Sequence, residues 1–384
     1  MTNLDFSALR SVPRLFIEVE LRSIPTERFQ PTGFADLGHA RYELSDGTKM
    51  LLVESAQSVA NRLEAAVWDE GNKDLIQPLR GLPYVRIRLD SKDGELGTTT
   101  TLQEAHRLNS GYLWTDKSIK PNEAMSAFRK ALRDALGLKD KPKKTSRKAK
   151  GGADKEKGEE EEEVKGVLDM QKIARALFAY DPNSILHGVF LEKLDGRMRL
   201  ARAISGFIEA RHIEVVQSGG VKNDRVDPKG SSSEGLGNVP FPRTEFTAKS
   251  ITAYFSLDLA LLRGYGLSEA ATDLLIALAL LKVGRFLENS LRLRTACEFE
   301  VLGEAHVKRP TSGFALPTTE TLLAAMPSYI AACKGLFADP AITDVGGFYE
   351  RKKKDKGQKQ DDEASGEETD TNADDDSSGN ESED

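Results

Sequence analysis

Hydrophobic and polar residues alternate along four stretches of the chain. In residues 15–22, Leu15, Ile17 and Val19 fall on one face, and mostly charged side chains fall on the other. A period of two is typical of a β-strand with one buried face. The same alternation runs through residues 85–90, 250–259 and 291–301. It predicts antiparallel sheet with one face covered and one face open.

A different spacing marks the predicted helices. Val59, Leu63 and Val67 recur at helical intervals behind Ser55, a residue type that caps helix starts. Further helices are predicted over residues 122–137, 169–180, 268–288 and 318–336. Strands and helices that mix without regular βαβ repeats predict an α+β fold. The simplest architecture is an antiparallel sheet with helices on one face.

Two charged segments interrupt the pattern. Residues 139–166 and residues 351–384 hold almost no apolar side chains, so they cannot offset the entropy of ordering. We expect both to be disordered, the first as an insertion and the second as an acidic tail. Residues 1–138 and 167–350 together are then expected to form one domain.

Net charge is concentrated in the tail. The chain has 54 basic and 61 acidic residues, which gives a net charge of −7. Residues 351–384 contain 6 of the bases and 13 of the acids, so residues 1–350 hold 48 of each. A neutral body lacks the strongly basic signature of many nucleic-acid binders. Any nucleic-acid site must therefore gather its basic groups on one face.

Catalytic and metal-binding motifs are missing. The sequence has no Walker A loop, no G-x-S-x-G elbow and no H-E-x-x-H helix, and its five histidines do not pair at metal-ligand spacing. Its two cysteines lie far apart and form no disulfide framework. We expect no cofactor, no metal and no enzymatic activity. The longest apolar run, Leu274–Leu281, is too short to span a bilayer, so a soluble cytoplasmic protein is expected.

One long segment combines flexibility with basic side chains. Residues 218–244 are rich in glycine and proline and connect two strand-like stretches. Long loops inside compact domains are uncommon and are often functional.

Several stretches in order along residues 15–300 resemble a known family. They are LGHARYELSDGTKMLLVESAQSVANRLE (37–64), GLPYV (81–85), LQEAHRLNS (102–110), ARAISGFIEA (201–210), SGGVKND (218–224), GNVPFPRTEFTAKSITAYFSLDL (237–259) and LRLRTAC (291–297). As a set they resemble the RAMP-superfamily backbone subunits of CRISPR Cascade complexes, the Cas-seven family, in its subtype I-G (formerly I-U) branch. Segments 139–166 and 351–384 have no counterpart in this resemblance.

The resemblance implies an RRM-like (ferredoxin-like) antiparallel sheet, the palm, with inserted finger and thumb elements. It implies a role in antiviral defence, in which copies of the subunit line up head to tail along the spacer of a CRISPR RNA (crRNA). Each copy grips the RNA backbone and leaves the base edges free to pair with target DNA. Further implied partners are a large subunit, a repeat-handle subunit and a separate helicase-nuclease. No membrane partner is expected.

The candidate RNA-binding residues fall in four groups, and each has a structural alternative. Arg62 on the first helix could meet a phosphate or pair with a nearby acid such as Glu64. The cluster after residue 102 could contact a phosphate or a 2′-hydroxyl, or it could finish a short helix. Basic residues of segment 218–244 could grip RNA or be solvated, and two arginines of stretch 291–301 could follow the RNA backbone or pair across strands. The candidates are Arg62; His106, Arg107 and Asn109; Lys222, Asn223, Arg225 and Arg243; and Arg292 and Arg294.

Two alternative functions remain open at this level. The first is a RAMP-type endoribonuclease that acts on CRISPR RNA or target RNA, with His106 or Asp224 as the catalytic candidate. The second is a protein-only scaffold subunit, which the neutral body favours.

Overall fold

The computed structural model describes residues 4–33, 38–114, 118–138, 168–194, 198–226, 229–230 and 237–349. The charged segments 139–166 and 351–384 lie outside the described residues. Their predicted disorder, and the prediction of one domain, stay predictions.

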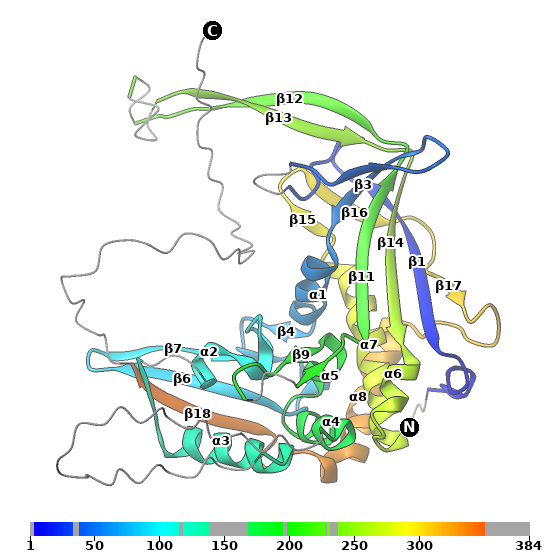
Figure 1. Ribbon diagram of the computed structural model, residues 1–384. Helices are drawn as coiled ribbons and strands as arrows, with labels where there is room; N and C mark the ends of the chain where they lie inside the picture. The colour runs from blue at the N-terminus through cyan, green and yellow to red at the C-terminus, as the bar shows by residue number, and fades with distance from the viewer. Residues whose placement is uncertain are drawn as a thin grey trace, which may run out of the picture.

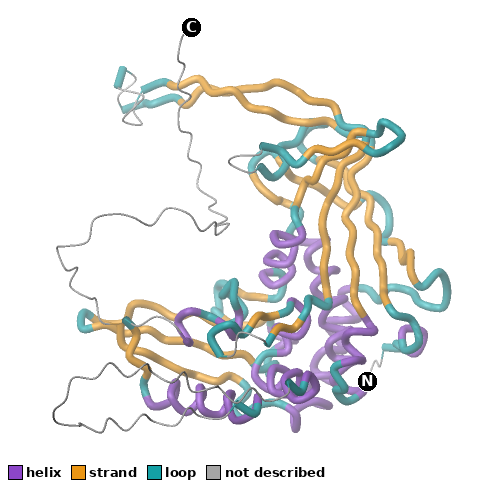
Figure 2. The backbone as a smooth tube through the Cα atoms, viewed as in Figure 1, coloured by secondary structure: helices purple, strands orange, loops and turns teal. Residues whose placement is uncertain are grey.

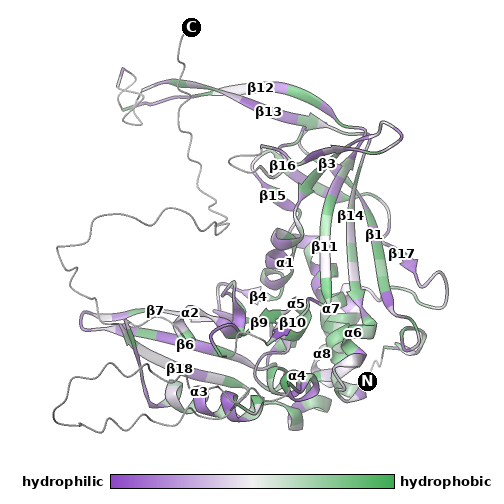
Figure 3. Cartoon of the chain, in the orientation of Figure 1, coloured by the Kyte–Doolittle hydropathy of each residue, from purple (hydrophilic) through white to green (hydrophobic). Residues whose placement is uncertain are grey.

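The main element is a large antiparallel sheet (Figure 1). Residue Val19 of its first strand is paired with Ala253, which is also paired with Ile208, so three apolar residues stand side by side on the covered face. In spatial order the strands are β15 (Arg292–Arg294), β16 (Cys297–Val301), β1 (Arg14–Ser23), β14 (Ser250–Asp258), β11 (Ile204–Arg211), β3 (Lys49–Glu54) and β2 (Arg41–Glu43), with β17 (His306–Arg309) also paired to β1. Burial alternates residue by residue along β1, β14 and β11. Figure 3 colours the same strands by the hydropathy of each residue.

Helices cover one side of this sheet. The central helix is α7 (Glu269–Asn289), which is capped by Ser268 and buried along most of its length. It contacts α1, α5, α8 and strand β16, and α1 in turn contacts β11. Together they enclose the core. The other helices here are α1 (Ala56–Ala65), α5 (Pro182–His187), α6 (Leu259–Gly264) and α8 (Thr319–Cys333).

A second, four-stranded sheet extends from one end of the molecule (Figure 1). Its central pair, β6 (Tyr84–Ser91) and β18 (Ile342–Tyr349), is parallel and joins residues far apart in sequence. Its edges are β7 (Gly94–Thr100) and β8 (Ile119–Pro121). Helix α3 (Glu123–Leu136) packs on β18, and α4 (Met170–Tyr180) packs on α3.

A long two-stranded ribbon leaves the opposite end of the large sheet, as Figure 2 shows. It consists of β12 (Glu214–Lys222) and β13 (Val239–Thr247), paired from Glu214 with Thr247 to Lys222 with Val239. We call this ribbon the arm. Shorter elements are the ribbons β4 (Trp68–Asp69) with β5 (Asp74–Leu75) and β9 (Val189–Phe190) with β10 (Arg199–Leu200), helix α2 (Gly111–Trp114), and the 3-10 turns Ser7–Leu9, Gln77–Leu79, Arg107–Asn109 and Lys334–Leu336.

The structure confirms the mixed α+β class and the predicted helices, whose caps Ser55, Asn122 and Ser268 accept the expected backbone N–H bonds. Three expectations are wrong. Stretch 291–301 is not one strand but the hairpin β15–β16, since Ala296 turns the chain at a φ of 57°. In segment 218–244, residues 218–222 and 239–244 belong to the β12–β13 ribbon instead of a loop, and residues 85–90 lie in the second sheet instead of the first.

Candidate nucleic-acid interface

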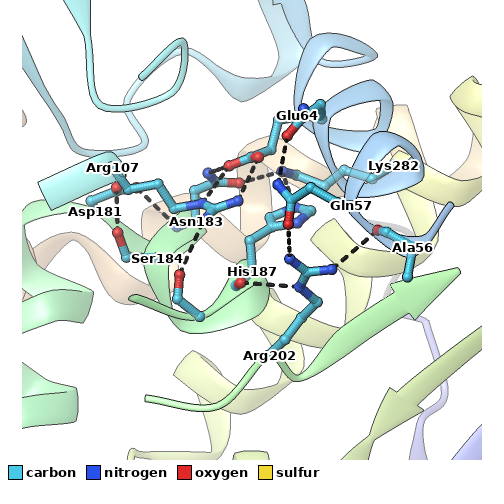
Figure 4. A network of polar contacts seen from close by, with 12 residues as sticks. Ala56, Gln57, Glu64, Arg107, Asp181, Asn183, Ser184, His187, Arg202 and Lys282 are labelled. Carbon is cyan, nitrogen blue, oxygen red and sulfur yellow. Dashed lines mark hydrogen bonds and ion pairs between the residues drawn. The ribbon is translucent and has the colours of Figure 1, made fainter. Parts of the chain in front are cut away.

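A buried network of polar side chains joins four elements below the large sheet (Figure 4). Glu64 of α1 accepts from Nε and Nη2 of Arg107, both at 2.7 Å. Its Oε1 also accepts from Nδ2 of Asn183 on α5 at 2.5 Å. Lys282 of α7 donates to Oδ1 of Asn183 and lies 2.9 Å from Nε2 of His187. The network therefore fixes α1, α5, α7 and the turn at Arg107 against one another.

Burial sets the charge states in this network. Burial lowers the pKa of Lys282 to about 8 and raises the pKa of Asp181 to about 6. Burial and the nearby Lys282 lower the pKa of His187 well below its usual value, so this imidazole is neutral. Since the ammonium of Lys282 only donates, Nε2 of His187 accepts, and its proton sits on Nδ1. That Nδ1 is buried and has no hydrogen-bond partner among the described residues.

The network forms one wall of a pocket of about 640 Å³. The pocket lies between the turn at 105–111, the end of α5 and the β9–β10 ribbon. A volume of this size falls within the usual range for small-ligand sites. Four arginine and lysine residues contribute to its lining, Arg107, Lys193, Arg199 and Arg202, together with His106 and the neutral His187.

Neutral groups of the described residues hold the Arg202 side chain. Its Nε, Nη1 and Nη2 donate to the carbonyl oxygens of His187 and Ala56 and to Oε1 of Gln57, at 3.4, 3.1 and 2.7 Å. Burial and the neighbouring Arg107 lower the pKa of Arg202. Its positive charge is therefore oriented by neutral groups, and among the described residues it forms no ion pair.

A second arginine of the pocket is also held by a neutral group. The guanidinium of Arg199 stands 4.6 Å from the centroid of the half-exposed Phe190 ring, a cation–π arrangement. Gly188 makes this geometry possible, because a Cβ there would lie 2.9 Å from both the Arg202 nitrogen and the Leu200 oxygen. The β9–β10 ribbon can therefore approach α5 only with glycine at this position.

The structure brings His106, Arg107 and Asn109 together in this pocket. His106 is exposed there, whereas Arg107 is buried and bound by Glu64. Arg107 also has a left-handed backbone with a φ of 52°. The Arg107 guanidinium is therefore committed to the buried network, which agrees with the structural alternative for this cluster, and its contact with RNA stays a prediction.

Arg62 and Arg294 meet at one buried carboxylate. Both donate to Glu54, which is fully buried, and Arg62 also donates to the carbonyl of Leu293 at 2.6 Å. Arg292 pairs with Glu298 at 2.9 Å on the neighbouring strand. The structural alternatives given for these three arginines therefore describe their contacts better than a continuous track along the sheet does.

The arm carries the remaining candidates. Arg243 stands 5.5 Å from the centroid of Phe241 and is half-buried. Lys222, Asn223 and Arg225 are exposed near the tip of the arm. Asp224 organises that tip, since its carboxylate accepts from the backbone N–H groups of Val226 and Gly237 at 2.8 and 3.2 Å.

The open face of the large sheet carries carboxylates. Glu20 and Glu209 flank Thr252 on the neighbouring strands β1 and β11. Glu18 lies two residues along and pairs with Lys308 at 3.1 Å. The Phe207 and Tyr254 rings stack beside them, with centroids 5.2 Å apart. Acidic side chains across the middle of this face disfavour a phosphate backbone there.

Sequence reasoning missed the two arginines that the pocket holds best, Arg199 and Arg202, and the buried His187 and Lys282. Arg202 does lie in the quoted stretch 201–210, but nothing in its spacing distinguishes it. Within the described residues, no group of three histidine, cysteine or acidic side chains could hold a metal ion. The search of the same residues also finds no helix that is long and apolar enough to cross a membrane.

Comparison with known proteins identifies the family. Residues 15–215 match the model of a family described as CRISPR-associated protein GSU0053, which is more than half of the chain, so this chain belongs to that family. The search of curated proteins finds no match.

Two solved structures are similar to this chain at low identity. A chain from a CRISPR RNA-guided surveillance complex in a pre-nicking state is 12% identical with a TM-score of 0.36, and the alignment covers 84% of this chain and 89% of that one. Csc2 of Thermofilum pendens is 10% identical with a TM-score of 0.29, over 84% and 76% of the two chains.

Proposed function

We propose that this protein is a non-catalytic, crRNA-binding backbone subunit of a type I CRISPR surveillance (Cascade) complex. It would be a Cas-seven-like RAMP subunit of the subtype I-G branch. The large sheet would serve as the RRM-like palm and the arm as the thumb. Membership in a CRISPR-associated family supports a role in antiviral defence.

The observation that carries the proposal is the arm. An isolated two-stranded ribbon is marginally stable in water, and this ribbon exposes Val215 and Val221. Its base is held by an ion pair between Arg28 and Glu245 at 3.1 Å. Contact with another molecule, such as an RNA strand or the next copy of the chain, would stabilise an arm built in this way.

The distribution of charge supports the choice of RNA. Exposed Lys222 and Arg225 lie near the arm tip, and Arg199 and Arg202 lie in the pocket, whereas the open sheet face carries Glu20 and Glu209. The arm and the second sheet extend toward the same side in Figure 1. RNA would therefore bind on the side of the arm and pocket. Contacts to phosphate and sugar hold an RNA of any sequence, as a guide requires.

Assembly follows from the same proposal. Copies would bind head to tail along one guide, and the guide would present its bases to target DNA. A large subunit, a repeat-handle subunit and a helicase-nuclease would complete the system, and the helicase-nuclease would perform the cutting.

A gel-shift titration tests RNA binding. We expect Lys222→Ala with Arg225→Ala to weaken binding of unrelated guide sequences alike, and to reduce the slope of log K against log salt concentration by about 1 per lost phosphate contact. The matched control is Arg22→Ala with Lys308→Ala, which removes two ion-paired charges near the acidic sheet face. If the arm and control variants bind RNA equally, the arm is not the RNA site.

The same preparations test the two alternative functions. Site-specific cleavage of repeat RNA or target RNA by the purified protein would establish the endoribonuclease instead. An RNA-free monomer that ignores added crRNA would establish the protein-only scaffold.

A further inference from the structure

The pocket beside the β9–β10 ribbon contains groups that could recognise a base as well as groups that could bind a phosphate. It is large enough for a small ligand, at about 640 Å³. Glu192 is the only acid among its described lining residues, and it pairs with Lys193 at 3.3 Å. Arg199 and Arg202 therefore leave the pocket with an excess of positive charge.

Arg202 has the geometry to receive an anionic oxygen. A guanidinium has five N–H groups, and three of those on Arg202 are used within the chain. One N–H on each of its terminal nitrogens is left to donate, and guanidinium N–H groups are favoured donors to phosphate oxygens. The three existing bonds fix the side chain beforehand, so little rotamer entropy would be lost when an anion binds.

Arg199 and Asn109 offer a stacking face and a hydrogen-bond donor to a nucleobase. The Arg199 guanidinium, held over Phe190, offers a planar cationic face of the kind on which nucleobases stack. Asn109 accepts from the Lys193 backbone N–H at 3.1 Å through Oδ1, so its amide nitrogen is the part that can donate. Carbonyl oxygens and ring nitrogens of a base accept such a bond.

We propose that this pocket binds a single nucleotide unit, with its phosphate on Arg202 and its base stacked on Arg199. The inference stands on the pocket and does not depend on guide binding. The nucleotide is either a free nucleoside monophosphate or one residue of an RNA strand, and the chemistry of recognition is the same for both.

Isothermal titration with AMP, UMP, the matching nucleosides and inorganic phosphate tests the proposal on the full chain. We expect AMP and UMP to bind about tenfold or more tightly than adenosine and uridine, because the nucleosides lack the phosphate. Arg202→Gln should remove that difference. Arg199→Ala should weaken both the nucleotide and the nucleoside. The control Arg22→Ala, remote from the pocket lining, should change neither.

A short single-stranded RNA separates the two sources. If free nucleotides do not bind but a six-nucleotide RNA binds and weakens about tenfold in Arg202→Gln, the ligand is a residue of RNA. Should Arg202→Gln fail to fold, Arg202→Lys keeps the charge and loses the paired N–H groups, and it should still weaken nucleotide binding. Wild-type protein that binds neither probe, or pocket variants that bind both as well as wild type, would overturn the proposal.

The outcome is distinguishable from that of the proposed function. If nucleotides bind at the pocket but guide RNA does not bind the arm, the pocket assignment stands and the backbone role fails. If guide RNA depends on the arm and is indifferent to Arg199 and Arg202, while free nucleotides do not bind, the backbone role stands and the pocket assignment fails.

Discussion

Glu64 and Arg107 form a bidentate ion pair in the interior, although 43 residues separate them in sequence. Both side chains are buried, and each has a further partner, Asn183 for the acid and the carbonyl of Gly188 for the arginine. The pair connects helix α1 to the turn that opens the pocket. Its integrity therefore matters both for stability and for the shape of the pocket wall.

Glu64→Gln is expected to destabilise the protein by about 3–5 kcal/mol, the cost of removing one partner from a buried ion pair. Arg107 and Lys282 would then share an interior with less negative charge. Urea unfolding followed by circular dichroism measures the change. The control Asp134→Asn breaks the exposed pair with Lys130 and should cost about 0.5 kcal/mol or less. Equal losses in both variants would show that the buried pair contributes no more to the free energy of unfolding than an exposed pair does.

The buried Lys282 makes stability depend on pH. Its folded-state pKa is lowered from 10.5 to about 8, so between these values the unfolded chain holds a proton that the folded chain has released. Stability rises with pH wherever the unfolded state binds more protons. We therefore expect the free energy of unfolding of wild type to rise relative to Lys282→Met from pH 8 to pH 10. A flat difference over that range would mean that Lys282 titrates normally in the folded state.

Gly188→Ala should disturb the pocket more than its backbone angle alone predicts. The residue has a φ of 76°, and an added Cβ would lie 2.9 Å from backbone atoms of Arg202 and Leu200. Gly303→Ala is the matched control, since its φ is 82° and no atom of the described residues lies within 4 Å of the added Cβ. We expect the control to lose about 1 kcal/mol and Gly188→Ala to lose clearly more. Thermal unfolding of the two variants decides, and equal losses would mean that the ribbon shifts without cost.

Arg294→Ala is expected to weaken folding and leave RNA binding unchanged. The substitution removes one of two arginines from the fully buried Glu54, and a buried carboxylate with fewer partners is costly. The salt dependence of RNA binding, measured on the folded fraction, should match that of wild type. A smaller salt slope would instead restore Arg294 to the RNA site.

The alternation of apolar residues and the helix-capping residues predicted the elements that depend on residues close together in sequence. Strands β1 and β14 and helices α3 and α7 follow from residues within each element, and the structure has them close to the predicted bounds. The hairpin turn at Ala296 was not predictable, because alanine gives no signal for a φ of 57°. The second sheet was missed because it pairs residues 84–90 with residues 342–348.

The site was predicted only in part for a similar reason. His106, Arg107 and Asn109 were selected from one local stretch, and they do line the pocket. Nothing in the sequence distinguishes Glu54 and Glu64 from surface acids, yet both are buried and bind the arginines that were expected to face RNA. Arg199 and Arg202 reach the pocket through the β9–β10 ribbon, a contact that depends on the tertiary fold.

Native mass spectrometry of the protein on single-stranded RNAs of increasing length tests the central claim most directly. A backbone subunit that binds head to tail should add copies in proportion to RNA length, so an RNA twice as long should carry about twice as many copies whatever its sequence. The arm variant should lose this series, and the Arg22→Ala, Lys308→Ala control should keep it. A copy number that stays fixed as the RNA lengthens, or no bound RNA at any length, would contradict the account.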